Sequence, residues 1–181
     1  AAWLVADHRA LRRYGLGFVK PFPLPLWPHL RNGYLLRGST PAELARKAGL
    51  DAAGLEKTIA EFNGPATRGL DPAFGKGTTA YNRYLGDAKH PISHCVAPLD
   101  QGPWYAIKLL PGDLGTFAGI RTDECARALA ADGKPVPGLY AVGNDALSVM
   151  GGNYPGGGIT LGPALSFGWI AGRHLAEVST Q

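Results

Sequence analysis

Apolar residues at helical intervals predict a helix that begins after Asp51. Leu55, Ile59 and Phe62 lie four and three residues apart, so their side chains share one helix face. Asp51 stands where an N-cap accepts hydrogen bonds from the first free N–H groups. The turn-forming run Asn63-Gly64-Pro65 is predicted to end this helix.

A shorter helix is predicted just upstream, over residues 41–48. Thr40 and Glu43 have the spacing of a capping box, Pro41 occupies the first helical position, and Gly49 follows as the closing residue. The segment before it, residues 21–28, has a proline at nearly every second position, so neither a helix nor a central strand is expected there. Its apolar side chains are predicted to need a surface on which to pack.

Beyond residue 103 the pattern changes from helical spacing to short apolar runs. Strands are predicted over 104–110, 117–122 and 126–129, and Asp132-Gly133 is typical of a hairpin turn. The run 139–142 places apolar residues on both faces, which predicts a short buried strand. The chain is therefore predicted to divide near residue 103.

A glycine-rich run over 151–162 follows this last strand and leads into a predicted helix over 160–177. Strand, glycine-rich loop and helix in that order bring bare N–H groups and a helix N-terminus to one point, which favours an anionic or electron-rich ligand. Tyr154 is the one phenol in the loop. Glycine inside a helix is unfavourable by roughly 1 kcal/mol relative to alanine, so Gly168 and Gly172 predict close approach of a sheet or a ligand.

Composition narrows the functional classes. The chain has 181 residues and a net charge of +4, and its basic residues are scattered, which argues against nucleic-acid binding. No apolar run approaches the roughly 20 residues of a membrane span. Cys95 and Cys125 are too few for a disulfide framework, so a cytoplasmic protein is expected. No metal is expected, because Pro91 disfavours the helix that the spacing of His90 and His94 requires.

Two segments of the second half resemble a known family. Residues 138–145 and 150–164, which contain Gly-Gly-Asn-Tyr-Pro-Gly-Gly-Gly-Ile-Thr-Leu-Gly, are similar to the C-terminal flavin-binding segment of the fumarate reductase/succinate dehydrogenase flavoprotein superfamily. Within it they most closely resemble the 3-ketosteroid dehydrogenase branch. The resemblance continues through other parts of the chain, more thinly in the first half: residues 102–106 and 115–123, then 33–63 and 71–87.

The resemblance implies a mixed fold, α+β or α/β, made of parts of two domains. Residues 1–102 would be the remainder of a cap or substrate domain, and residues 103–181 the closing segment of a split FAD-binding domain. The dinucleotide fingerprint G-x-G-x-x-G is missing, and Gly15-Leu16-Gly17 is the nearest approach to it. We therefore expect a fragment that lacks the N-terminal part of its protein, retains little FAD and is inactive alone. The absence of an initiator methionine before Ala1 agrees with this.

The resemblance also implies FAD as the cofactor and names site residues. Tyr154 and the backbone N–H of Gly158 would polarise the substrate's ketone oxygen as an oxyanion hole, which makes them the catalytic pair. The helix N-terminus would face the pyrimidine end of the flavin. The residues expected to contact the cofactor are Gly143, Asn144, Gly157, Gly158, Ile159, Thr160 and Leu161. The catalytic base is expected upstream of Ala1.

Two departures from fumarate reductases bear on the substrate. Those enzymes have an arginine where Tyr154 stands and a histidine pair in place of Leu114 and Gly115, because a dicarboxylate needs charge pairing. The differences favour a hydrophobic ketone such as a 3-ketosteroid, with hydrogens removed from the adjacent C–C bond. A fumarate reductase-like protein acting on an enoate and a non-catalytic fragment that binds hydrophobic ligands remain alternatives. Exposed strand edges and a bare helix face predict self-association.

Overall fold

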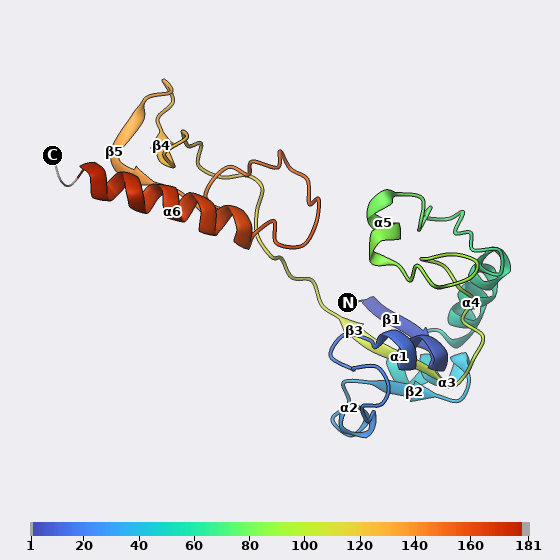
Figure 1. The fold of residues 1–181 in the computed structure, drawn as a ribbon. Helices are drawn as coiled ribbons and strands as arrows, with labels where there is room; N and C mark the ends of the chain where they lie inside the picture. The colour runs from blue at the N-terminus through green and yellow to red at the C-terminus, as the bar shows by residue number, and fades with distance from the viewer. Residues whose placement is uncertain (1, 179–181) are drawn as a thin grey trace. The chain divides into compact units, whose positions relative to one another are not determined.

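The computed structural model describes residues 2–178, and the chain forms two compact units, Ala1–Pro111 and Gly112–Gln181. Figure 1 shows their helices and strands. Both helices and strands occur in each unit, so the mixed fold class is confirmed, and each unit is described below by itself.

The first unit contains a three-stranded antiparallel sheet in the order β1-β3-β2. β1 (Ala2–Asp7) and β2 (Leu36–Gly38) lie on either side of β3 (Trp104–Leu109), so that Ala106 faces both Val5 and Leu36. The strand predicted over 104–110 is therefore present. A buried cluster of side chains packs beside the sheet: Ala6, Leu11, Leu16, Val19, Leu35, Tyr105 and Ile107.

Asp7 joins the sheet to the first helix, α1 (His8–Tyr14). Its carboxylate is fully buried, and it accepts hydrogen bonds from the backbone N–H groups of Ala10 at 2.8 Å, Asp100 at 3.3 Å and Gln101 at 3.2 Å. A buried carboxylate requires such partners, because its desolvation is otherwise strongly unfavourable. Asp7 thus caps α1 and holds the turn that precedes β3.

The two helices expected in this unit are present as α3 (Pro41–Ala48) and α4 (Ala52–Ala66), capped by Thr40 and Asp51. α4 does not end at Asn63-Gly64-Pro65 as the sequence predicts, but continues through Ala66. Pro65 lies in the last turn, where its missing N–H removes one helical bond, and the N–H of Thr67 still donates to the carbonyl of Asn63 at 3.2 Å.

Two short helices were not predicted. α2 (Trp27–Arg31) begins inside the proline-rich segment, so the expectation of no helix there is wrong at Trp27 and Pro28. The helix tolerates Pro28 because a first-turn residue has no helical N–H partner to lose. α5 (Ala80–Leu85) is capped by the hydroxyl of Thr79, which accepts from the N–H of Asn82 at 3.1 Å. Of the apolar side chains in the proline-rich segment, Leu26 packs against the core cluster, whereas Phe22 and Trp27 are 73% and 62% exposed.

The second unit consists of a hairpin, a 3-10 turn and a long helix. β4 (Arg127–Leu129) and β5 (Pro135–Tyr140) pair antiparallel around the predicted turn at Asp132-Gly133. The 3-10 turn η1 (Gly143–Asp145) follows, and the predicted C-terminal helix is α6 (Leu161–Val178). No helix over residues 2–178 is long and apolar enough to cross a membrane.

Two strand predictions in this unit are wrong. Residues 117–122 form only isolated bridges: Ile120 pairs with Ala146 in the loop after η1, and Thr122 pairs with Ala128 of β4. The run 139–142 is not a strand buried on both faces: β5 ends at Tyr140, and Leu139 is 46% exposed because the described residues supply only β4 as a partner.

The boundary between the units falls after Pro111, later than the predicted division near residue 103. β3 accounts for the difference, because it is the central strand of the first unit. The assignment of residues 1–102 to a cap domain and of 103–181 to an FAD-binding domain remains a prediction.

Hydrogen bonds to Glu43 at the start of α3 make the stability of the folded state depend on pH. The carboxylate of Glu43 accepts two hydrogen bonds, one from the Lys47 ammonium at 2.6 Å and one from the backbone N–H of Ser39 at 2.8 Å. These bonds lower the pKa of Glu43 from 4.5 to about 2, and the bond from Lys47 has the largest effect. A depressed pKa stabilises the folded state above pH 4.5, and this contribution disappears as the pH falls towards 2.

We therefore expect Glu43→Gln to lower the free energy of unfolding at neutral pH, with a difference from wild type that shrinks between pH 4.5 and 2. Urea unfolding across this range measures it. Glu56→Gln is the matched control, because Glu56 is an exposed glutamate on neighbouring α4. A difference for Glu43→Gln that does not vary with pH would contradict the capping role.

Candidate functional site

The candidate site lies where η1 meets the start of α6. Gly143 permits this meeting, because its φ is +61° and a Cβ there would lie 3.0 Å from the Cβ of Ala164. The small side chain of Ala164 allows this close approach. Gly168 and Gly172, in contrast, have no described atom within 4 Å of a Cβ built on them.

The segment 117–120 closes the site by pairing with residues 145–148. The N–H of Ile120 donates to the carbonyl of Asp145 at 2.8 Å, and the N–H of Leu147 donates back to Ile120 at 2.8 Å. The N–H of Ser148 donates to the carbonyl of Phe117 at 3.0 Å. This pairing brings a segment from before the hairpin against the loop that leads to α6.

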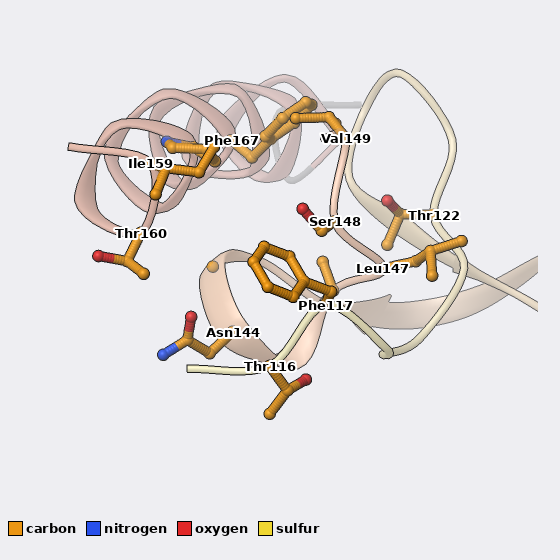
Figure 2. A pocket seen from close by; sticks show the side chains of 13 residues that line it. Thr116, Phe117, Thr122, Asn144, Leu147, Ser148, Val149, Ile159, Thr160 and Phe167 are labelled. Carbon is orange, nitrogen blue, oxygen red and sulfur yellow. The ribbon is translucent and has the colours of Figure 1, made fainter. Parts of the chain in front are cut away.

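A small cavity of about 40 Å³ lies between these parts. Figure 2 shows its side chains, with the ring of Phe117 in the middle of the labelled group. A cavity of this size holds water but not a flavin ring, so a large ligand would lie across its mouth. The lining residues are Thr116, Phe117, Thr122, Gly143, Asn144, Ala146, Leu147, Ser148, Val149, Ile159, Thr160, Pro163 and Phe167.

The structure brings only part of the predicted site residues together at this cavity. Gly143, Asn144, Ile159 and Thr160 line it. Gly157, Gly158 and Leu161 are on the same loop or helix start but outside the lining, and Tyr154 lies on the loop with 40% of its surface exposed. The cavity is therefore a neighbour of the predicted catalytic pair and does not contain it.

The sequence did not single out four of the lining residues, Thr116, Phe117, Ser148 and Phe167. The resemblance of residues 115–123 to the flavoprotein family was the only signal that could have found part of it. The lining contains no ionisable side chain. It offers hydroxyl, amide and aromatic groups instead, and it holds no candidate for the catalytic base.

An ion pair at the start of β4 lies outside the lining. The Arg127 guanidinium lies 2.7 Å from the carboxylate of Asp123. Burial of Asp123 acts to raise its pKa, but the hydrogen bonds from the Arg127 side chain and from backbone N–H groups outweigh burial and lower the pKa. This pair fixes the turn between the segment 117–122 and β4.

The N-terminus of α6 presents unsatisfied donors. The N–H groups of Ile159, Thr160 and Leu161 donate to no other described residue, whereas that of Gly162 donates to Gly158 at 2.7 Å. The first turn of α6 contains no acidic side chain that would compete for these donors. The helix N-terminus carries about half a positive charge. The arrangement therefore suits a ligand with electron-rich oxygen or nitrogen atoms.

A model of the FAD binding domain family matches residues 1–161 of the chain. The chain belongs to this family. It is 49% identical over 178 residues to the 4-oxocyclohex-2-ene-1-carboxylate 5-dehydrogenase of Sinomonas cyclohexanicum, covering 98% of the chain and 30% of that protein. It is 43% identical over 176 residues to a 3-oxosteroid 1-dehydrogenase of Mycobacterium tuberculosis, covering 97% of the chain and 31% of that protein.

A solved structure supports the same assignment. The 3-ketosteroid delta1-dehydrogenase of Sterolibacterium denitrificans, in complex with 1,4-androstadiene-3,17-dione, matches with a TM-score of 0.82 and 38% identity. The match covers 97% of this chain and 32% of that one. The chain thus spans about a third of the length of these relatives, and the predicted resemblance to flavin-dependent ketosteroid dehydrogenases is confirmed.

The residues of the site fit FAD as the family's cofactor. The free N–H groups of Ile159 to Leu161 match the acceptor atoms of a flavin pyrimidine ring, and a Cβ built at Gly156, Gly157 or Gly158 would meet no described atom within 4 Å. A planar ring therefore has room to approach this backbone. Across residues 2–178 no cluster of three or more His, Cys, Asp or Glu side chains could hold a metal ion.

Two glycines of the loop provide a matched pair of variants. Gly158 has a φ of +92°, a conformation that L side chains rarely adopt, and Gly156 does not have a positive φ. Both have open space for a Cβ, so they differ only in backbone conformation. We expect Gly158→Ala to cost about 1–3 kcal/mol of loop stability, and Gly156→Ala to cost little. Urea unfolding of the two variants measures the difference, and equal effects would contradict this backbone conformation.

Proposed function

We propose that this chain is part of an FAD-dependent dehydrogenase that removes hydrogens from a C–C bond next to a ring ketone. The supporting observation is the order of groups along one loop: the exposed Tyr154, the left-handed Gly158 and the unpartnered N–H groups at the start of α6. This order places two possible donors to a ketone oxygen next to a helix end that suits a flavin.

In this proposal Tyr154 and Gly158 hold the substrate. The Tyr154 hydroxyl and the Gly158 N–H make no hydrogen bond to another residue within the described part of the chain, so both remain available as donors. When both groups donate hydrogen bonds to a ketone oxygen, they stabilise the negative charge that develops as the adjacent carbon loses its proton. Bound FAD supplies the acceptor for the hydride from the neighbouring carbon. The base is assigned to no residue here, because the cavity lining has no ionisable group.

The substrate class follows from the position of Tyr154. A tyrosine donates one hydrogen bond to a neutral oxygen, whereas an arginine would favour a carboxylate at this position. The names of the two relatives above share a ring ketone, carried by a steroid in one and by a cyclohexene carboxylic acid in the other. We propose a hydrophobic ring ketone, such as a 3-oxosteroid, as the substrate.

The proposed partner of this chain is the rest of a longer protein. Leu161, Leu165 and Trp169 on α6 are 70%, 74% and 64% exposed. A bare apolar helix face of this kind needs a covering surface. The relatives are about three times as long as the chain, so they contain residues that could supply the surface and the remaining contacts to FAD.

Tyr154→Phe tests the proposed chemistry. In the FAD-loaded protein that contains this chain, we expect kcat to fall by about 10²–10³, the effect of removing one oxyanion donor, while flavin absorbance is unchanged. Tyr84→Phe is the control, because Tyr84 is 83% exposed and lies in the other unit. A Tyr154→Phe protein with wild-type kcat would exclude the hydroxyl from catalysis.

Anaerobic flavin reduction tests the substrate class. We expect the flavin to be reduced on mixing with a 3-oxosteroid or with 4-oxocyclohex-2-ene-1-carboxylate, and the faster of the two identifies the preferred ring ketone. If neither ketone reduces the flavin and fumarate oxidises the reduced protein, the chain belongs to an enoate reductase and the proposal is wrong.

A further inference from the structure

We propose that Asn144 is a positioning residue that fixes the wall segment, residues 114–117, against η1; Thr116 and Phe117 of this segment line the cavity. The inference rests on the proposed function only in taking the ligand at this wall to be the flavin. It assigns to Asn144 a task beyond direct contact with the cofactor: the side chain orders the segment to which Thr116 and Phe117 belong.

The contact between Asn144 and this segment is specific. The side-chain Nδ2 of Asn144 donates to the backbone carbonyl of Leu114 at 3.2 Å. The Asn144 side chain also fills the space beside the backbone of Gly115. A Cβ built on Gly115 would lie 2.6 Å from Cγ and 2.7 Å from Nδ2 of Asn144. The residue at 115 must therefore be glycine for as long as the Asn144 side chain stays in place.

The wall segment has few other attachments. None of the N–H groups of residues 114–117 donates to a described residue. The carbonyl of Phe117, which accepts from the N–H of Ser148 at 3.0 Å, is the next point where the segment bonds to the rest of its unit. The upstream end of the wall thus depends on Asn144, and the downstream end on the pairing with Ser148.

A wall that is ordered in advance strengthens ligand binding. Apparent affinity falls by the fraction of molecules in the competent conformation, so a loose wall would weaken the binding of any ligand that contacts Thr116 or Phe117. Asn144 would therefore affect ligand affinity through these two residues, even though neither is its neighbour in the sequence.

Amide exchange at Ser148 tests the positioning role without any cofactor. We expect Asn144→Ala and Asn144→Asp to raise the exchange rate of the Ser148 amide by about fivefold, the effect of losing one net hydrogen bond. The aspartate keeps the shape but cannot donate to the Leu114 carbonyl. Asp145→Asn is the matched control. Its exposed side chain lies in the same 3-10 turn and makes no hydrogen bond to a described residue, so the substitution should leave the rate unchanged.

A double-mutant cycle separates this role from general stability. Gly115→Ala alone should raise Ser148 exchange strongly, because the methyl group collides with Asn144. In the Asn144→Ala background the collision is gone, so adding Gly115→Ala should have little further effect. The Leu129 amide, which donates to the carbonyl of Arg121 in the hairpin, should not change in any variant. Additive effects of the two substitutions, or equal changes at Leu129, would overturn the proposal.

Flavin affinity provides the functional readout. In the FAD-loaded protein that contains this chain, Asn144→Ala should raise the Kd for FAD, because the Kd rises as the fraction of molecules with an ordered wall segment falls. If Ser148 exchange rises but the Kd does not, Asn144 is structural only and the positioning role is wrong. If the wild-type protein binds no flavin but the exchange results are as expected, the proposed function is contradicted, whereas the role of Asn144 in ordering the wall segment still holds.

Discussion

The pairing of residues 117–120 with residues 145–148 is the interaction on which the candidate site depends. It joins two segments that lie on opposite sides of the hairpin β4–β5, and it does so mainly through backbone groups. Backbone pairing of this kind tolerates many side chains, so the site can vary its lining without losing its shape. Gly119 permits the approach, because a Cβ at that position would collide with the backbone of Ala146.

Two different surfaces meet at this pairing, and each suits a different part of a ligand. The cavity lining around Thr116, Phe117 and Asn144 is neutral and partly aromatic, whereas the start of α6 presents N–H donors and a partial positive charge. A flavin has both an aromatic ring and electron-rich pyrimidine atoms. The cavity lining contains no ionisable side chain.

The relatives place a limit on what this chain can do alone. It spans about a third of their length, and its long helix α6 has an exposed apolar face. The same loop that carries Tyr154 leaves its glycines open to solvent. The exposed helix face suits the contact with further protein proposed above, and the open loop suits approach of the cofactor.

Local chemistry was readable from the sequence. Thr40 and Asp51 cap helices because each accepts hydrogen bonds from N–H groups two or three residues away, and Asp132-Gly133 forms its turn for an equally local reason. The resemblance of residues 138–145 and 150–164 to a flavoprotein family was also evident from the sequence, and the match to the FAD binding domain family confirms it. The helix continuing past Pro65 was not, because a proline in a last turn removes only one bond.

Tertiary structure alone decided the contacts between distant residues. β3 lies between β1 and β2, with Ala106 facing Val5, and no periodicity within residues 104–109 indicates a partner about a hundred residues away. In the same way, nothing around Asn144 in the sequence indicates that its amide reaches Leu114. The sequence by itself determined the caps, the turn and the glycine loop, since these depend on neighbours along the chain. The cavity and the wall segment depend on contacts between residues 114–120 and residues 144–148, which are distant in sequence and meet only in the folded chain.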